Sequence, residues 1–289
     1  MICIGKKLVN DELKIYRGND FVVSKYIHVH QASLSEICNY GEREYYSMIY
    51  QLTATPQSMK VQLWDMGIDY TKITPYELFY SILFKLYSQE KTSIIFGNLD
   101  LTKFHLIQNQ DDGTIFLYQR IEKNSCNAND IKKNSILSKI ITKFKTVFKI
   151  SDKKTTTEYD EIVIDESSYN VIMDYLRQSH GIHRDEKIPG NESTKMILIE
   201  DDREEMERNK NKDYHSQLKN LISAMINCEG FKYNHNDVWD MKIGAFMDSV
   251  KRVTKIKNAN LLLQSGYSGF GVNLKEISNK QLDWMGELE

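Results

Sequence analysis

The chain of 289 residues is close to electrical balance, with 38 lysines and arginines against 40 aspartates and glutamates. This balance gives no overall field that would favour nucleic acid or an anionic membrane surface. Three prolines are too few for the turns of an all-β sandwich, and no apolar run reaches the ~18 residues of a membrane-spanning helix.

The first elements that the sequence predicts are short strands. Residues 14–16 and 21–30 have strand-like patterns, and the turn signal Arg-Gly-Asn-Asp separates them. In the second strand, the odd-numbered side chains from Phe21 to Val29 share one mostly apolar face. We therefore expect a small antiparallel β element at the start of the chain.

Two helix starts follow this β element. Ser33 and Glu36 form an S-x-x-E capping box, and Gly41 interrupts the helical pattern after it. Thr55 is the expected N-cap of a second helix, with proline at its first position and Gly67 at its end. These signals predict a helical segment broken at two glycines.

Residues 74–77, Thr-Pro-Tyr-Glu, are the clearest helix start in the chain. They combine an N-cap, a proline at the first helical position and a capping-box glutamate. The pattern that follows, to about Ser88, is apolar or aromatic nearly all round. Such a helix belongs in the centre of a core or in an interface.

The middle of the chain mixes strand patterns with charged segments. Residues 92–121 return to a strand pattern, and residues 104–108 and 114–121 flank a hairpin signal. Residues 132–154 carry eight lysines beside an apolar stripe, which predicts a basic amphipathic helix. A solvated lysine face is the plain interpretation of this segment, with membrane-surface or nucleic-acid contact as the alternatives.

The remaining sequence is mainly helical. A strand at residues 161–164 precedes a helix that we expect to be capped near Ser167 and to end at Gly181, and an acidic run occupies residues 200–213. Apolar stripes at 218–226, 239–253 and 261–263 predict three more helices. Ser278 caps a last short helix.

These elements predict an α+β fold that is predominantly helical, with a small N-terminal antiparallel β element and a central hairpin. The expected division is an N-terminal block at 1–123, a lysine-rich segment or linker at 124–158 and a mainly helical block at 159–289. The four cysteines are far apart in sequence, so reduced cysteines of a cytosolic protein are favoured over disulfides. The first residues carry no apolar run typical of a signal peptide.

Histidine pairs are the best candidates for chemistry. His180 and His183 have H-x-x-H spacing at a helix end, where two imidazoles could share a metal ion, but no third ligand accompanies them. His28 and His30 share one face of a strand. A helix C-terminus favours a histidine without any metal. A metal-dependent hydrolase that uses His180 and His183 is therefore only a minor alternative.

Two further patterns lack the residues that their chemistry needs. The glycine-rich residues 266–271 have no phosphate-binding lysine and follow a helix instead of a strand. The acidic residues at 201–205 lack the glycine and spacing of a calcium loop. The sequence predicts no catalytic residue, no metal site and no cofactor, and hence no enzyme.

Two blocks of the chain resemble a known family. Residues 27–67 contain QASLSEICNYGE at 31–42, and residues 238–288 end in a leucine-tryptophan helix at 282–284. Together they resemble the tail assembly chaperones, and other late structural-cluster proteins, of tailed bacteriophages of Gram-positive bacteria. The resemblance covers about a third of the chain, which is longer than many members of that family.

The resemblance implies a non-enzymatic morphogenesis protein that coats the amphipathic tape-measure protein until tail-tube subunits displace it. Such a protein needs adaptable apolar surface, which tyrosine and methionine provide. The expected partner contacts, each with core packing as the alternative, are Tyr45, Tyr46, Met48, Tyr50, Met59, Leu63, Trp64 and Met66.

The resemblance also bears on location and on other partners. We expect the chain in the host cytoplasm, bound to tape-measure or other tail proteins, with self-association as a further expectation. A permanent virion component, such as a minor tail, baseplate or head–tail protein, is the main alternative. Neither a membrane nor nucleic acid is an expected partner.

Overall fold

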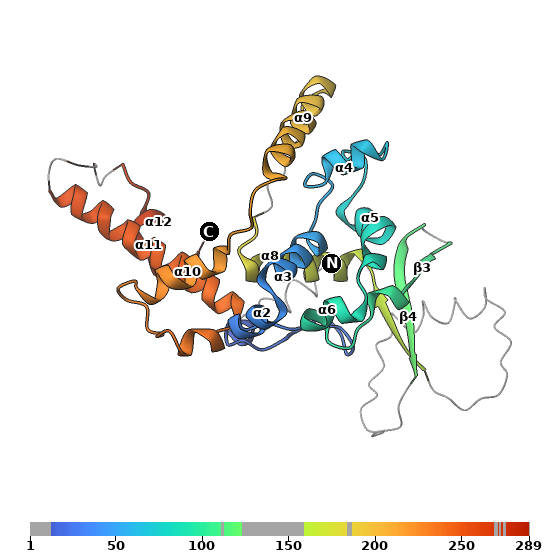
Figure 1. The fold of residues 1–289 in the computed structure, drawn as a ribbon, viewed down its shortest axis with the longest axis horizontal. Helices are drawn as coiled ribbons and strands as arrows, with labels where there is room; N and C mark the ends of the chain where they lie inside the picture. Colours follow the sequence, from blue (N-terminus) through green and yellow to red (C-terminus); the bar gives the residue numbers. More distant parts are fainter. Residues whose placement is uncertain are drawn as a thin grey trace.

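The computed structural model describes residues 13–110, 113–122, 159–183, 187–268, 271, 273 and 276–288. The amphipathic helix expected at 132–154 lies outside the described residues. Helices dominate the described part, and two small antiparallel sheets accompany them (Figure 1). The predicted α+β, predominantly helical class is therefore confirmed.

The N-terminal β element is a tiny hairpin. β1 (Phe21–Val22) pairs antiparallel with β2 (His28–Val29), and the chain reverses between them. The single long strand expected at 21–30 is wrong, because Ser24 accepts a hydrogen bond from the Ile27 N–H (3.2 Å) and stabilises a turn there. The strand expected at residues 14–16 is also wrong, since they form a helical turn.

The capping box at Ser33 is formed as predicted. The backbone N–H of Ser33 donates to Glu36 Oε2 (2.6 Å), and the Glu36 N–H donates to Ser33 Oγ (3.2 Å). This box opens α2 (Leu34–Tyr40), and α3 (Glu42–Leu52) follows directly. Gly41 separates the two helices with φ of +103°, a conformation that residues with a Cβ rarely adopt.

Ser33→Ala should lower the free energy of unfolding by about 1 kcal/mol, because it leaves the Glu36 N–H without its partner. Urea denaturation of both proteins measures the difference. The matched control is Ser223→Ala on the exposed side of a helix, which should be neutral or slightly stabilising. Equal effects of the two substitutions would contradict a capping role for Ser33.

The helix expected at Thr55 begins later than predicted. Thr55 Oγ1 does accept from the Ser58 N–H (3.2 Å), but Ser58 Oγ donates to the Thr55 carbonyl oxygen (2.9 Å). Such local side-chain bonds compete with helical ones, so a turn precedes α4 (Lys60–Asp65). Gly67, with φ of +75°, follows the helix end as predicted.

The start at Thr74 is confirmed in detail. Thr74 and Glu77 form a capping box with Pro75 at the first position of α5 (Pro75–Leu78). The helix continues as a π-helical stretch, η1 (Phe79–Leu83), and a 3-10 turn, η2 (Phe84–Leu86). Phe79 and Phe84 are each 2% exposed, so this segment lies in the core.

The strand expected from residue 92 is wrong for the first residues of that range, which are helical. Residues 92–96 belong to α6 (Gln89–Phe96), with Thr92, Ile95 and Phe96 buried. Their spacing of three and four places them on one helical face, and tertiary burial overrides the β-branched composition. A 3-10 turn, η3 (Leu101–Lys103), leads from α6 to the predicted hairpin.

The central hairpin is confirmed and gains a third strand. β3 (His105–Gln108) pairs with β4 (Ile115–Glu122), and β4 pairs with β5 (Tyr159–Ile164), all antiparallel. The sheet therefore joins segments that lie on both sides of the lysine-rich segment. The three-part domain division stays a prediction.

Helix α8 (Glu166–His180) follows the sheet, with Asp165 as its N-cap and Gly181 at its end. Helix α9 (Glu192–Asn209) begins before the predicted acidic run. It lies beside α4 and projects with it from the rest of the fold (Figure 1). Ion pairs join the two helices, Lys60 with Asp202 and Arg203 with Asp65.

The C-terminal region contains α10 (Gln217–Ile226), the 3-10 turn η4 (Asp237–Asp240), α11 (Ile243–Tyr267) and α12 (Asn279–Leu282). The two helices expected at 239–253 and 261–263 are instead one helix of 25 residues. No glycine or proline interrupts the sequence between Val253 and Leu261, so nothing there ends the helix.

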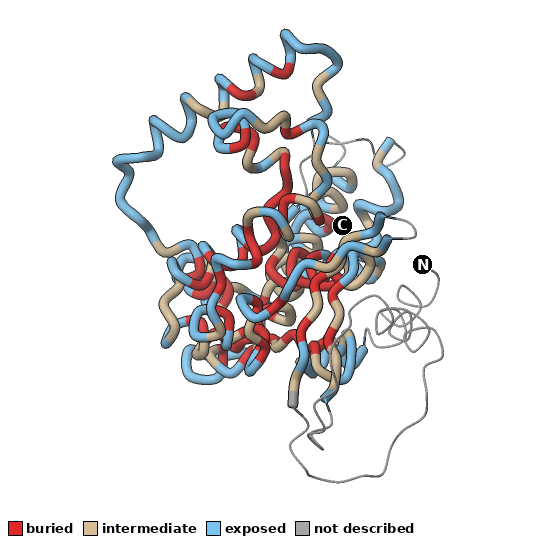
Figure 2. The backbone as a smooth tube through the Cα atoms, turned by 90° about the vertical axis from the view of Figure 1, so that its right-hand side faces the viewer, coloured by how far each residue is buried: buried red, intermediate tan, exposed pale blue. Residues whose placement is uncertain are grey.

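The two blocks that carry the family resemblance are in contact. The Leu34 N–H donates to the Met241 carbonyl (3.0 Å), and the Ile243 N–H donates to the Ala32 carbonyl (2.9 Å). The Leu218 N–H donates to Glu42 Oε1 (2.9 Å), which joins α3 to α10. Buried residues of both blocks belong to one hydrophobic core, and Figure 2 shows the buried backbone gathered in the interior of the fold.

Among the described residues, the helices are too short or too polar to cross a membrane.

Candidate functional site

The eight expected partner contacts lie on α3, on α4 and next to α4. Tyr45, Met48 and Leu63 are 1%, 5% and 0% exposed, so their side chains point into the core. Tyr46 and Met59 are partly buried and pack against that core. The side chains that reach solvent are Tyr50, Trp64 and Met66, which are 55%, 37% and 58% exposed. A role in partner binding stays a prediction for all of them.

The outer face of α3 carries an aromatic stripe. Arg43, Tyr46 and Tyr50 follow one another at helical spacing on this face. The Tyr46 and Tyr50 ring centroids are 6.2 Å apart, and the Arg43 guanidinium lies 5.7 Å from the ring centroid of Tyr214. Tyrosine and arginine are enriched where proteins bind one another. Arg43 and Tyr214 were not predicted, although the spacing of 43, 46 and 50 marks the stripe.

A second exposed apolar area lies on α4 and α9. Trp64 of α4 and Met66, which directly follows α4, are exposed, and α9 adds Ile197 and Met206, which are 59% and 47% exposed. Lys195 lies 5.9 Å from the Trp64 ring centroid. Ile197 and Met206 were not predicted from the sequence. The apolar residues of α9 form no clear stripe and are mixed with acidic residues, so no amphipathic pattern marks them.

His180 is a buried hydrogen-bonding group. Its Nε2 is 2.7 Å from the Tyr45 hydroxyl, and its Nδ1 is 2.7 Å from the Leu176 carbonyl oxygen. A neutral ring satisfies both contacts, because Nδ1–H donates to the carbonyl and Nε2 accepts from tyrosine. Burial lowers the pKa of His180 to about 4, despite the opposing effect of the Leu176 hydrogen bond.

The H-x-x-H pair does not converge on one site. His183 is exposed while His180 is buried, and both nitrogens of His180 are occupied. Among the residues that the structure describes, no three His, Cys, Asp or Glu side chains are placed to hold a metal ion.

A surface hollow of about 470 Å³ lies between the β1–β2 hairpin and the end of α6. His30 lies at its edge between two carboxylates: Nδ1 is 2.7 Å from Asp20 Oδ1, and Nε2 is 3.2 Å from Glu36 Oε1. An ionised carboxylate only accepts hydrogen bonds, so both ring nitrogens of His30 face acceptor oxygens. With both nitrogens engaged, His30 offers no free nitrogen as a base or a metal ligand.

Glu36 is held in its charged form. Burial alone would raise the pKa of its carboxyl, but hydrogen bonds from Ser33 and the nearby charges of Lys242 and His30 lower this pKa to about 2. Lys242 Nζ is 3.4 Å from Glu36 Oε2. Glu36 therefore caps α2, lines the hollow and pairs with Lys242 at the start of α11.

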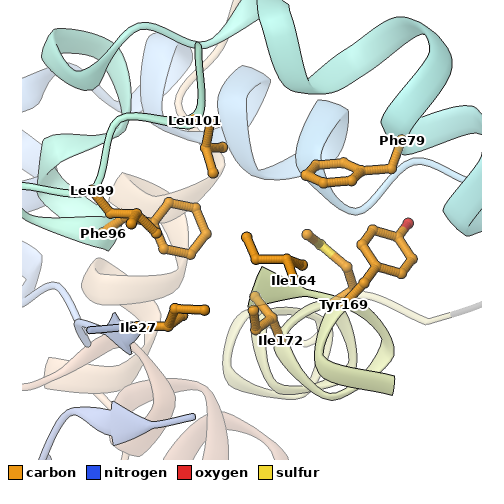
Figure 3. Close-up of a pocket in the computed structure, with 9 residues that line it drawn as sticks. Ile27, Phe79, Phe96, Leu99, Leu101, Ile164, Tyr169 and Ile172 are labelled. Atoms are coloured by element: carbon orange, nitrogen blue, oxygen red, sulfur yellow. The ribbon is translucent and has the colours of Figure 1, made fainter. Parts of the chain in front are cut away.

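The core also contains a small apolar cavity of about 10 Å³ (Figure 3). It is lined only by Ile27, Phe79, Phe96, Leu99, Leu101, Ile164, Tyr169, Ile172 and Met173. A cavity of this size holds one water at most, and a water needs polar partners that these walls lack. The cavity is a packing gap and not a ligand site.

Residues 209–289 match a family model described as the YomV second domain. The matched part contains α10, η4, α11 and α12, and it covers less than half of the chain. No curated protein and no solved structure matches the chain. The YomV family is phage-derived, so the match associates this chain with bacteriophages.

Proposed function

We propose that the chain is a non-enzymatic phage morphogenesis protein, and specifically a tail assembly chaperone that binds the tape-measure protein in the host cytoplasm. The observation that carries the proposal is the exposed aromatic and methionine surface of α3 and α4. It occurs in a chain whose C-terminal part matches a phage-derived family. The sequence resemblance to tail assembly chaperones supplies the specific role.

The physical basis is the nature of the exposed side chains. Tyr50 and Trp64 offer large, partly apolar surfaces with few rotatable bonds, and Met66 can adapt its shape to different partners. A long amphipathic client presents apolar stripes that such side chains can cover. The two histidines best placed for chemistry, His30 and His180, are already hydrogen-bonded at both ring nitrogens.

Co-expression with the tape-measure protein tests the proposal. The chain should raise the soluble fraction of that protein, and the double variant Tyr50→Ala/Trp64→Ala should lose most of this effect, because it removes two exposed aromatic anchors. The matched control is Leu261→Ala/Tyr267→Ala, which removes side chains that are 63% and 80% exposed on α11. A tape-measure protein that is equally insoluble with and without the chain would sink the proposal.

A permanent virion component is the second candidate. It is favoured by the projecting pair α4 and α9 (Figure 1), because α9 is 18 residues long and its exposed side chains suit repeated contacts within an assembled particle. Mass spectrometry of purified virions beside infected-cell lysate separates the two functions. A chaperone should be abundant in lysate and scarce in virions, whereas a structural component should be present in virions at a fixed ratio.

A further inference from the structure

We propose that copies of this chain bind one another through two helices of opposite charge, with α9 of one copy packed against α11 of a second copy. In a single copy the two helices project in different directions and lie apart (Figure 1). The contact needs no client and serves a chaperone and a virion component equally, so it goes beyond the proposed function.

Helix α9 carries an excess of negative charge. It has seven acidic and three basic residues. All three basic residues already pair with acidic side chains of α9 itself or of the region around α4. Among the residues that the structure describes, Asp201 and Glu205 form no ion pair, and both are exposed. The negative charge of α9 is therefore not balanced within one copy.

Helix α11 carries the opposite excess. It has one acidic and four basic residues. Arg252 and Lys255 donate to main-chain carbonyl oxygens of residues 284–287 at 2.5 to 2.7 Å. These acceptors are neutral, so the contacts hold the C-terminal segment without cancelling charge. Lys257 is exposed and has no ion pair within the described part of the chain.

Exposed apolar side chains lie beside the charges on both helices. Ile197 of α9 is 59% exposed, and Asp201 and Glu204 follow it by four and seven residues, which places all three on one helical face. On α11, Leu261 is 63% exposed and follows Lys257 by four residues. Packing the two faces together buries both apolar side chains while opposite charges meet.

Charge also identifies the second copy as the partner. Packing α9 on α9, or α11 on α11, would bring like charges together, which opposes association. The surface that complements α9 is thus carried by α11 of the same kind of chain. Because the contact joins two different surfaces, each contact leaves α9 of one copy and α11 of the other free for further copies.

Sedimentation velocity of the full chain tests the contact. The natural chain should associate as its concentration rises. Raising the salt to about 0.5 M should increase the dissociation constant roughly tenfold, because salt screens exposed charges. Two charge reversals, Asp201→Lys/Glu204→Lys on α9 and Lys251→Glu/Lys257→Glu on α11, should each increase it about tenfold or more.

Mixing the two variants is the decisive step. The mixture contains the natural α11 of the first variant and the natural α9 of the second, so association should return, which also shows that both variants are folded. The matched control is Lys91→Glu/Lys219→Glu, which reverses exposed lysines of α6 and α10 and should change nothing. A natural chain that stays monomeric up to about 1 mM, unchanged association of either variant, or a mixture that does not associate would overturn the proposal.

Discussion

Acidification from about pH 7 to about pH 5 should lower the free energy of unfolding by about 2 kcal/mol through His180 alone. In the unfolded chain this histidine takes up a proton near its ordinary pKa of 6.5, whereas burial holds the folded pKa at about 4. The unfolded state therefore binds more protons between these two values. Stability is full above pH 6.5, falls as the pH drops toward 4, and has no further His180 contribution below that.

Urea denaturation at several pH values, compared between the natural chain and His180→Gln, isolates this effect. Glutamine can accept a hydrogen bond from Tyr45 but does not titrate in this range. The Glu36 carboxyl, whose pKa is lowered from 4.5 to about 2, contributes stability that is lost only below pH 4.5. The pH range of the His180 effect therefore lies mostly above that of the Glu36 effect, and the two effects can be measured separately. Parallel pH profiles of the two proteins between pH 7 and pH 5 would show that His180 is not the cause.

Phe79→Ala should destabilise the fold by about 3–5 kcal/mol. Phe79 is 2% exposed, its ring centroid lies 4.9 Å from that of Tyr169, and it lines the apolar cavity. Removing the ring would enlarge this cavity where the walls come from several elements and cannot all collapse inward (Figure 3). The loss of stability therefore has two parts that add: the lost free energy of transferring the ring out of water, and the cost of the enlarged cavity.

Leu86→Ala is the matched control on the same helical segment. Leu86 is 56% exposed, so its truncation should cost less than about 1 kcal/mol. The midpoint and slope of urea denaturation measure both variants. Similar losses for the two would mean that the π-helical stretch is not part of the central core.

Local sequence signals predicted several starts and ends of elements correctly. Ser33 with Glu36, and Thr74 with Glu77, form their capping boxes because each depends on side chains three residues apart. Gly41 and Gly67 mark helix ends because each adopts a positive φ that residues with a Cβ rarely adopt. The hairpin of β3 and β4 also follows from a local turn signal. Phage association was likewise expected from the resemblance and is supported by the family match.

Long-range contacts explain what the sequence did not predict. Residues 92–96 are helical because the core accepts Thr92, Ile95 and Phe96 on one helical face. The third strand, β5, finds its partner across the lysine-rich segment, and no local pattern encodes that pairing. The contact of His30 with Asp20 and Glu36 needs the chain to turn back between β1 and β2.

By itself, the sequence determined the fold class and the local caps, because these depend on composition and on side chains a few residues apart. Tertiary structure alone decided which aromatic residues are available to a partner: Tyr45 is buried against His180, while Tyr50, on the same helix, stays exposed. Tertiary structure also buries His180 and leaves His183 exposed, so the two imidazoles do not share one site. The physical reason is that burial and convergence depend on packing between distant segments, which helical spacing alone does not specify.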